Sequence, residues 1–548
     1  MRNIFIPTMA IASGLFLLAS CSGFLDENPK STLTSKAYYK TEAQLTGNVT
    51  YLYRTGAPTQ FASTGAYEPS FMAGNSMLTG YFTNSYEGQE LSNRYSRLLT
   101  RQEQTQTISG TVDGVWDGCY RAINVANGAL KSVPILLEEG TLTQASADFI
   151  EGQALFFRAF NYMMLVKTFG DVPLSEEFIM DFNQESELPR TSAATVYALI
   201  ESDLRTAASK LPDATYAGNG HRVTKWIAEM ALTDVLFYQG KYADAATEAK
   251  KIIGSNKFSL AVNTDEGANS AYNQLRAKDD LPESIYAYEY NSSLSTNGYT
   301  PCHAFSGSAT SVFSTWVIFE RVFGPTNRYL NVYEEGDLRV EPNQFFHWTY
   351  TRPDDATKSW SAPEFTTGYM DGFVNIDFDN MGYQYPGCWY YYDEEGLLST
   401  GRGTKDWNIY RYAETLLDAA EAIVQSSSVT AEAAGYLAQV QSRAYGQTVA
   451  ALTTENQALT KEQFIQACWT ERLREFPFEY KIWDDCVRTG KFPNISTTTR
   501  GQVTYETLVG ATNASGAQIK ASDLLWPISL NEMQRNPNLT QNEGYQTR

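Results

Sequence analysis

The sequence predicts a mainly α-helical protein: a tetratricopeptide-like helical scaffold with a large irregular portion that is rich in loops and poor in strands. Three observations predict this class. Helical hydrophobic periodicity dominates the first half of the chain. It is lost from about residue 265 to residue 406, where Gly, Pro, Ser, Asn and Tyr are frequent, and it returns afterwards. Because a long irregular stretch inside a helical protein is usually functional, this portion is expected to carry the function of the protein.

The clearest helical pattern is found in the stretch that follows Glu151. Its apolar residues recur every three or four positions and therefore share one face: Leu155, Ala159, Tyr162, Val166 and Phe169. Gly170 and Pro173 predict its end, since glycine adopts the left-handed cap conformation and proline cannot continue a helix. A second helix is expected between an N-cap at Thr191 or Ser192 and Pro212.

Residues 224–253 predict a helix–turn–helix with Gly240 at the turn. The string "YQGKYADA" is typical of the turn of a tetratricopeptide repeat, although a strict 34-residue period is not visible. Helical patterns return at residues 408–424 and 463–492. We therefore expect one body over residues 36–548. Its scaffold would span roughly 36–260 and 405–548, and its ligand-binding portion roughly 265–406 plus an aromatic, polar loop at 80–98.

The N-terminal segment predicts a lipoprotein leader. Residues 1–20 combine a positive start at Arg2 with an apolar run that is too short to span a membrane. The run ends in Leu-Ala-Ser-Cys, which resembles the lipobox of bacterial lipoproteins, in which the cysteine is acylated. Cys21 is therefore the expected lipidation site, and residues 21–35 are expected to form a flexible tether. A plain secreted protein with a coincidental cysteine is the alternative.

Composition excludes several function classes. The formal net charge of −20 argues against nucleic acid and against anionic lipid surfaces as partners. Six cysteines at wide spacings do not form a disulfide framework, and none has CxxC spacing, so neither zinc nor any other metal or cofactor is expected. Tyr, Phe and Trp together make up 13% of the chain, and aromatic rings both fill cores and stack on ligands.

A catalytic set is not apparent, and the protein is predicted not to be an enzyme. HExxH, GxSxG and phosphate-loop motifs are all absent from the sequence. The adjacent Cys302 and His303 are better interpreted as loop residues than as a thiol nucleophile. The stretch from Asn375 to Gly382 offers Asp377, Asp379 and Asn380 as oxygen ligands, but it lacks the final Glu of an EF-hand loop.

Paired carboxylates are the last catalytic candidates in the sequence, because glycoside hydrolases need two. Glu471 and Glu475 lie one helical turn apart, interleaved with arginines, and Glu414 and Glu421 lie two turns apart near Arg411. Alternating charges at this spacing usually form ion pairs, so a structural role is predicted for all four. With 62 acidic residues in the chain, a pair contributed by loops stays open.

Seven stretches in order resemble blocks of the SusD/RagB family of outer-membrane lipoproteins of Bacteroidota. They are "FLDENP" after Cys21, "VWDGCYRAINVAN" (115–127), "EGQALFFRAFNYMMLVKTFGDVPL" (151–174), "YEEGDLR" (333–339), "YRYAETLLDAAEA" (410–422), "ERLREFPFEYKIWD" (471–484) and "WPISLNEMQRNPNLTQNEGY" (526–545). The second block resembles a Trp-x-x-x-Tyr-x-x-Ile-Asn-x-x-Asn helix. Four positions depart from the common pattern and put local ion pairing in question: Gln153, Phe157, Pro477 and Lys481.

The resemblance implies a surface-exposed lipoprotein, anchored in the outer membrane, that captures a glycan and delivers it to a TonB-dependent, SusC-like β-barrel transporter. It implies a site on loops near residues 80–98 and 285–330. The expected aromatic platforms are Tyr81, Tyr86, Tyr95, Tyr299, Trp316 and Tyr329. The expected donors to sugar hydroxyls are Asn84, Arg94 and Asn297. Second choices are Trp348, Trp360 and the run from Trp389 to Tyr392.

Three alternatives remain open from the sequence alone. Some members of the family deliver peptides, and a peptide-binding protein would share this fold. A lipid-anchored glycoside hydrolase would need a carboxylate pair contributed by loops. A pure tetratricopeptide scaffold for an outer-membrane assembly would bind no small ligand.

Overall fold

The computed structural model describes residues 39–61, 70–83, 91–103, 105–179, 187–264, 270–291, 293, 323–341, 344–346, 349–352, 354–361, 390, 393 and 402–546. The expected leader, Cys21 and the tether therefore lie outside the described residues. The α-helices are α2 (Glu42–Leu52), α3 (Phe71–Ser76), α4 (Leu91–Arg97), α5 (Thr105–Glu138), α6 (Gln144–Phe169), α7 (Ala193–Lys210), α8 (Lys225–Tyr238), α9 (Tyr242–Gly254), α10 (Ala271–Ala277), α12 (Asn327–Leu330), α15 (Tyr412–Ser426), α16 (Ala431–Tyr445), α17 (Val449–Gln457), α18 (Lys461–Glu475), α19 (Ile482–Thr489) and α20 (Leu530–Arg535).

Shorter elements complete the described fold. The 3-10 helices are η1 (Ala57–Phe61), η2 (Met77–Thr79), η3 (Ala217–Asn219), η5 (Leu338–Val340) and η8 (Ala521–Leu524). The strands are β1 (Phe82–Thr83), β2 (Ser284–Tyr288), β3 (Gly324–Pro325), β4 (Thr349–Thr351), β5 (Ser359–Ser361), β6 (Trp407–Arg411), β7 (Lys491–Ile495) and β8 (Val503–Thr507). They pair two by two and antiparallel, as β1–β3, β2–β6, β4–β5 and β7–β8.

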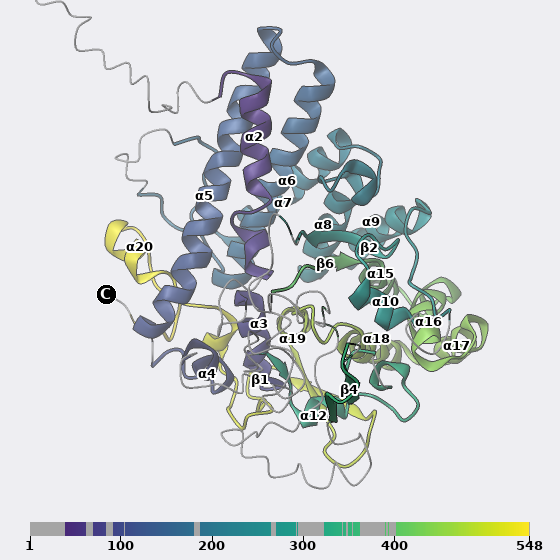
Figure 1. Ribbon diagram of the computed structural model, residues 1–548. Coiled ribbons are helices and arrows are strands. Elements are labelled where there is room, and N and C mark those ends of the chain that lie inside the picture. Colours follow the sequence, from purple (N-terminus) through teal and green to yellow (C-terminus); the bar gives the residue numbers. More distant parts are fainter. Residues whose placement is uncertain are drawn as a thin grey trace, which may run out of the picture.

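Successive helices pack against one another along the scaffold. α5 packs on α6, α6 on α7, α7 on α8 and α8 on α9. The series then continues through α15 to α16 and α17, with α18 on the side of α15 (Figure 1). This succession of neighbouring helix pairs is the arrangement of tetratricopeptide-like repeats. The expected mainly helical, tetratricopeptide-like class is confirmed.

The local signals in the sequence placed the helix ends correctly. α6 ends at Gly170, which has a φ of 73° and donates its N–H to the Val166 carbonyl. α7 begins after Ser192, whose hydroxyl accepts a hydrogen bond from the Thr195 N–H. Gly240, with a φ of 72°, forms the turn between α8 and α9. Each case follows from glycine's access to the left-handed region or from a side chain that satisfies a free helix N–H.

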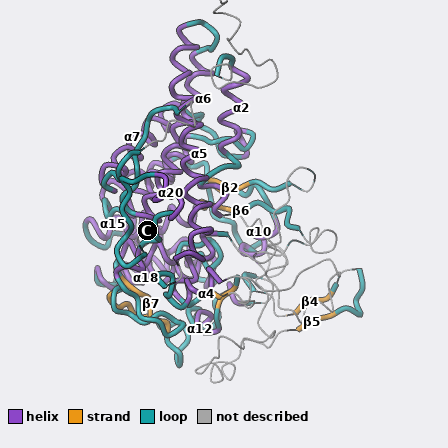
Figure 2. Tube along the Cα trace, turned by 90° about the vertical axis from the view of Figure 1, so that its left-hand side faces the viewer, coloured by secondary structure: helices purple, strands orange, loops and turns teal. Residues whose placement is uncertain are grey.

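The irregular portion is inserted between α9 and α15 and is closed at its base by two strands. β2 leads into it and β6 leads out of it, and these strands pair antiparallel, with Ser284 opposite Arg411 and Tyr288 opposite Trp407. Figure 2 shows the helices gathered on one side and the β4–β5 hairpin projecting on the other. The β2–β6 pair therefore joins the two ends of the insertion at the scaffold.

The block at residues 115–127 has a structural task. Tyr120 donates its hydroxyl hydrogen to the Pro173 carbonyl at 2.8 Å. Asn124 bonds both backbone groups of Ile179, accepting from its N–H at 2.8 Å and donating to its carbonyl at 3.1 Å. Asn127 donates to the Ser175 carbonyl at 3.1 Å. This face of α5 therefore holds the extended chain of residues 173–179 in place.

A buried network of ion pairs joins the base of the insertion to α16 and α18. The Arg411 guanidinium contacts Glu479 at 2.7 Å and Glu475 at 3.1 Å, and it also pairs with Glu283. Arg443 pairs with Glu283 and with Glu475, each at 2.6 Å. Four of the five side chains are at most 2% exposed and Arg443 is 5% exposed, so the pairs are almost unscreened by solvent.

The structural role predicted for the four carboxylates is confirmed. Glu471 and Glu475 both bind Arg339, at 2.8 and 3.2 Å. Glu414 lies 3.1 Å from the Lys481 ammonium, so the lysine found at this departure from the family pattern supplies an ion pair. Glu421 accepts a hydrogen bond from the Arg488 guanidinium at 2.8 Å. These carboxylates are held by cations and are not poised as a catalytic pair.

Two carboxyl groups meet between α8 and α9. Glu229 and Glu248 are both buried, at 5% and 3% exposure. Burial and the neighbouring Glu248 raise the pKa of Glu229 to about 7. Arg205 binds Glu248 at 2.6 Å, whereas the Lys251 ammonium is 3.7 Å from Glu229. The Glu229 carboxyl is therefore protonated in the folded protein at mildly acidic pH.

Replacing Glu229 with Gln is expected to stabilise the protein at pH 8. An ordinary Glu pKa of 4.5 in the unfolded chain and about 7 in the folded one means that folding loses stability as pH rises between these values. Gln cannot ionise and avoids this loss, which we expect to be roughly 1–3 kcal/mol above pH 7. Urea denaturation at pH 5 and pH 8 measures it. Equal effects of the substitution at both pH values would contradict the assignment.

Candidate ligand-binding site

The two segments that were expected to form the site meet at a pair of strands, β1 and β3. Thr83 precedes the loop at 84–90 and lies opposite Gly324, which follows the stretch 294–322. The Thr326 N–H also donates to the Tyr81 carbonyl at 2.8 Å. The β1–β3 pair therefore brings together segments about 240 positions apart in sequence, as the predicted site at 80–98 and 285–330 requires.

Aromatic rings form a continuous floor beneath these strands. Phe82 stacks on Phe323 with centroids 4.9 Å apart and planes inclined by 1°. Phe323 meets Tyr480 edge-on at 5.2 Å, and Tyr480 stacks on Trp407 at 5.0 Å. Trp407 in turn contacts Tyr390 at 6.4 Å. Each such pair contributes about 0.5–1.5 kcal/mol beyond its burial, so the floor fixes the bases of several loops at once.

Two of the predicted platforms belong to this floor and not to a binding surface. Tyr81 is 0% and Tyr329 is 1% exposed. The Tyr81 hydroxyl donates to the Pro493 carbonyl at 2.7 Å, and that of Tyr329 donates to the Leu473 carbonyl. Their assignment as stacking platforms is therefore corrected to core residues.

Arg94 and Tyr95 remain on the accessible side. Both lie on α4, where Arg94 is exposed and Tyr95 is half-buried against the core. The Asn513 amide holds this helix by donating to the carbonyls of Arg97 and Leu78, at 2.8 and 3.0 Å. α4 also contacts β1, which places both side chains beside the base of the loop at 84–90.

The other predicted contacts lie outside the described residues or have no described side chain. Outside are Asn84, Tyr86, Asn297, Tyr299, Trp316, Trp348, Trp389, Tyr391 and Tyr392, together with Cys302, His303, Asp377, Asp379 and Asn380. Trp360 is described only as a residue of β5. Their assignment stays a prediction.

A cationic side chain at the edge of the site was missed by the sequence analysis. The exposed Arg54 guanidinium lies over the Tyr288 ring at 4.4 Å from its centroid and over Tyr290 at 5.8 Å. The alternation of Tyr286, Tyr288 and Tyr290 was the available signal, since every second residue of a strand faces the same side. Arg54 itself precedes the insertion by more than 200 residues, and no local pattern links it to these tyrosines.

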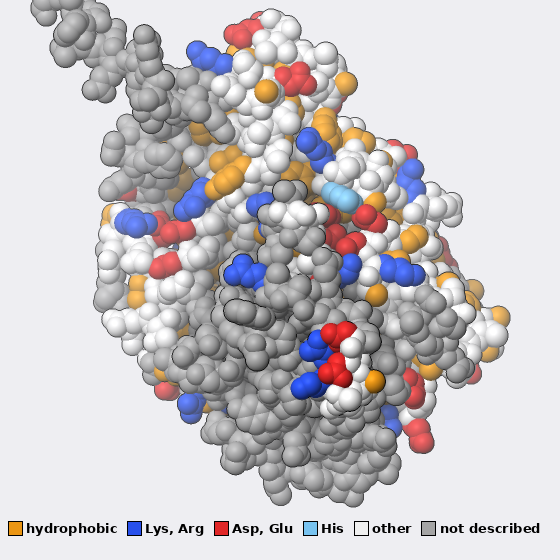
Figure 3. All heavy atoms as spheres, viewed as in Figure 1, with side chains coloured by type: hydrophobic (Ala, Val, Ile, Leu, Met, Phe, Trp, Pro, Cys, Tyr) orange, Lys and Arg blue, Asp and Glu red, His pale blue; other side chains and the backbone are white. Residues whose placement is uncertain are grey.

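Acidic side chains gather where the insertion leaves the scaffold, beside the one histidine drawn in colour in Figure 3. His221 lies 2.8 Å from Asp280 and 3.5 Å from Glu289. Burial and the nearby carboxylates Glu289 and Asp279 raise the pKa of Asp406 to about 8. The Asp406 carboxylate accepts the Tyr290 N–H at 2.8 Å, so it also fastens the end of β2.

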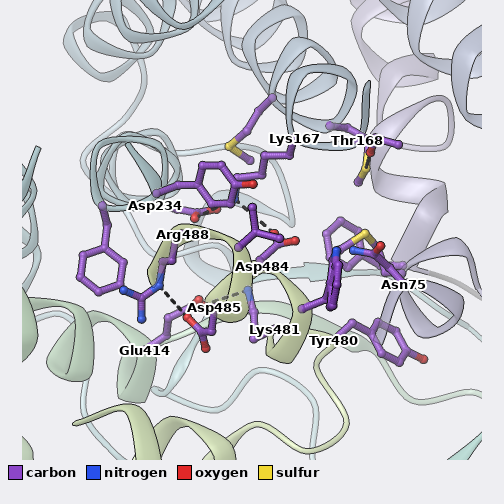
Figure 4. A pocket seen from close by; sticks show the side chains of 18 of the residues that line it. Asn75, Lys167, Thr168, Asp234, Glu414, Tyr480, Lys481, Asp484, Asp485 and Arg488 are labelled. Carbon is purple, nitrogen blue, oxygen red and sulfur yellow. Dashed lines mark hydrogen bonds and ion pairs between the residues drawn. The ribbon is translucent and has the colours of Figure 1, made fainter. Parts of the chain in front are cut away.

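An enclosed polar cavity of about 50 Å³ lies between α6, α8, α15 and α19 (Figure 4). Lys167 binds Asp234 at 2.9 Å and approaches Asp484 at 3.5 Å. Arg488 binds Asp485 at 2.7 Å. A space of this size holds a water molecule or two but no sugar, and its charges are paired. The cavity is part of the scaffold.

The described residues contain neither an activated thiol nor a candidate metal centre. Cys119, Cys468 and Cys486 are buried and free, and burial raises the pKa of each thiol. Within the described ranges, no three His, Cys, Asp or Glu side chains gather in a way that could hold a metal ion. No helix of those ranges is long and apolar enough to cross a bilayer.

Two family models match separate parts of the chain. The model of the SusD family matches residues 324–545, and a model described as starch-binding, associating with outer membrane, matches residues 23–235. The chain belongs to the SusD family. Neither model describes an enzyme. The resemblance drawn from seven short blocks is thereby confirmed.

Named relatives of this SusD-family chain cover most of its length. SusD-like protein P2 of Formosa agariphila is 26% identical over 485 residues, which are 86% of this chain and 88% of that protein. Starch-binding protein SusD of Bacteroides thetaiotaomicron is 22% identical over 71% of this chain and 72% of its own.

Solved structures show the same fold. A SusD superfamily protein from Parabacteroides distasonis matches with a TM-score of 0.72 and 23% identity, covering 94% of this chain and all of its own. Surface glycan-binding protein A from Bacteroides thetaiotaomicron, in complex with laminarihexaose, matches with a TM-score of 0.64 and 17% identity. That match covers 92% of this SusD-family chain and all of the other.

Proposed function

We propose that the protein captures an oligosaccharide at the cell surface and passes it to a TonB-dependent β-barrel transporter of the SusC type. The observation that carries the proposal is the β1–β3 pair, which joins the bases of the two predicted ligand loops on a fixed aromatic floor. Membership in a family that includes starch-binding proteins supports the ligand class. A complex of one structural neighbour with laminarihexaose supports it further.

Capture works by stacking and edge bonding. A sugar ring has an apolar C–H face and polar hydroxyl edges, and flat aromatic side chains bury the face. Tyr86, Tyr95, Tyr299 and Trp316 are the proposed platforms, and Asn84, Arg94 and Asn297 the proposed hydroxyl partners. Arg54 joins them as a donor beside the base of the loops. Several weak contacts along the chain of sugars suit a protein that must release its cargo.

Cys21 is the proposed point of acylation, and residues 21–35 the tether between the outer membrane and the body. We expect the body to bind the glycan without hydrolysing it, and the four helical carboxylates that could have formed a catalytic pair are engaged by arginine and lysine. Co-purification from detergent-solubilised outer membrane tests the partner. Recovery of the protein without a β-barrel transporter, repeatedly and in mild detergent, would overturn that part of the proposal.

A Trp316→Ala variant of residues 22–548 is expected to bind glycan at least about tenfold more weakly. The change removes one stacking face, and 1.4 kcal/mol corresponds to a factor of ten in affinity. Native affinity gels against starch, laminarin and other polysaccharides, with a peptide pool beside them, measure it. Tyr51→Ala is the matched control, because Tyr51 is 45% exposed on α2, outside the site.

Three outcomes of this screen would count against the proposal. Unchanged affinity in Trp316→Ala would remove that residue from the site. Retardation by peptides alone would move the protein to the peptide-binding alternative. Release of reducing sugar would indicate a hydrolase.

A further inference from the structure

A second cleft lies apart from the ligand loops, between α5, the chain at 173–179 and the C-terminal segment around α20. It encloses about 380 Å³, which falls within the range of about 300–1,000 Å³ that is usual for ligand pockets. In Figures 1 and 2, α20 lies well away from β4 and the insertion. The proposed function does not use this cleft.

The floor of the cleft is apolar. Trp116 and Ile123 of α5 are 3% and 2% exposed, and Leu539 from the C-terminal segment is 5% exposed. Tyr120, half-buried, lies between the floor and the rim, and its ring is tilted on Trp116 at 5.0 Å. The accessible apolar surface over this floor comes from Tyr120 and from Leu188, which is 37% exposed, and such a surface can accept the C–H face of a sugar.

The rim of the cleft carries both acidic and basic side chains, all of which can form hydrogen bonds. Asp117 and Arg121 of α5 and Glu177 of the 173–179 chain are exposed, as is Arg535, which pairs with Glu532 at 2.6 Å. Three carboxylates and two guanidinium groups nearly cancel in charge. This balance disfavours a strongly anionic or cationic ligand and suits a neutral ligand with many hydroxyl groups.

The walls are rigid, so the cleft exists before any ligand arrives. The paired hydrogen bonds between Asn124 and Ile179, and the donation from Asn127 to the Ser175 carbonyl, fix one wall on α5. On the other side, the Asn536 amide donates to the Leu188 carbonyl at 2.8 Å. A preformed site loses little conformational entropy on binding.

We propose that this cleft is a second carbohydrate site that holds one or two neutral sugar units. It rests on the proposed function, because the ligand class is the same, but it uses different residues and a different face of the molecule. A second contact on one chain of sugars would raise the avidity for long polysaccharides above the affinity of the loops alone.

The test is hydrogen–deuterium exchange of residues 22–548 with maltose and with laminaribiose. We expect one of these disaccharides to protect amides of the 173–179 chain. Filling the cleft by Ile179→Trp should abolish that protection and leave the protection near β1 and α4 unchanged. Val262→Trp is the matched control, since Val262 is 61% exposed elsewhere on the surface.

A second variant, on the rim of the cleft, tests the site independently in case Ile179→Trp does not fold correctly. Glu177→Ala combined with Arg535→Ala changes only exposed side chains, and we expect about tenfold weaker disaccharide binding at the cleft. Absence of protection at 173–179 with both disaccharides would overturn the second site and leave the first untouched. Protection that persists in Ile179→Trp would also overturn it. Protection at 173–179 that is unaffected by Trp316→Ala would support the cleft even if the loop site failed.

Discussion

Replacing Arg411 with Met is expected to lower the free energy of unfolding by roughly 3–5 kcal/mol. The guanidinium is fully buried, and it neutralises Glu283, Glu475 and Glu479 at the point where β6 meets α15. Met fills much of the same volume, but it leaves three carboxylates in the protein interior with too few cations. Arg443 alone then faces Glu283, Glu475 keeps only Arg443 and Arg339, and Glu479 loses a bidentate partner.

Urea denaturation at two pH values measures this effect and its cause. In the native protein Arg443 and Arg411 outweigh the effect of burial and lower the pKa of Glu283 to about 2. That carboxylate therefore contributes stability above about pH 4.5, which is lost as pH falls toward 2. In Arg411→Met the carboxylates that have lost this cation can take up protons. The loss of unfolding free energy relative to the native protein should therefore be smaller at pH 5 than at pH 8.

The control is an ion pair between helices at the surface. Lys250 of α9 and Glu432 of α16 lie 2.9 Å apart but are 45% and 42% exposed. Lys250→Met should cost less than about 1 kcal/mol, because solvent screens the pair. If both variants lost a similar amount of unfolding free energy, the effect of Arg411→Met would reflect a general sensitivity of the packed helices to substitution and not the burial of unpaired charge.

Features that depend on near neighbours in the sequence were predictable. The ends of α6, α7 and α9 follow from Gly170, Ser192 and Gly240, each of which acts within one turn of its own position. The structural role of Glu475 was also predictable from its spacing. Its partners were not, because Arg411 and Arg443 reach it only through the packing of β6 and α16 on α18.

The site was predictable at the level of segments and not of side chains. The family resemblance placed the two loops together, and the β1–β3 pair brings their bases together. Whether a tyrosine in such a segment faces solvent depends on residues far away. Tyr81 is buried by Pro493 and Phe492, about 400 positions along the chain, and local composition does not reveal this.

Replacing Gly80 with Ala is expected to weaken glycan binding at least about tenfold while the scaffold stays folded. Gly80 has a φ of 68°, and a Cβ there would lie 2.4 Å from the Ser515 nitrogen and 2.9 Å from the Ala514 nitrogen. These are backbone atoms, held by the donation from the Ala514 N–H to the Thr79 carbonyl at 2.9 Å. Backbone atoms cannot change rotamer as a side chain can, so β1 must move to make room for the Cβ.

That movement would act on the proposed site through the strand pair. β1 carries Phe82, which stacks on Phe323, and it pairs Thr83 with Gly324. Affinity gels with the glycan that the native protein retains, together with thermal melting, measure the two effects separately. We expect an unfolding cost of roughly 2–4 kcal/mol, made up of the left-handed conformation of Ala and the displaced contacts.

Gly220→Ala separates the two causes. Gly220 has a φ of 61°, but the position of its Cβ is open, with no atom within 4 Å, and it lies beside η3, outside the ligand loops. Gly220→Ala should lower the free energy of unfolding by about 1–2 kcal/mol, the cost of the left-handed conformation of Ala, without any loss of glycan affinity. Equal affinity in Gly80→Ala and Gly220→Ala would mean that the β1–β3 pair does not position the glycan contacts, and the site would then have to be sought on other elements.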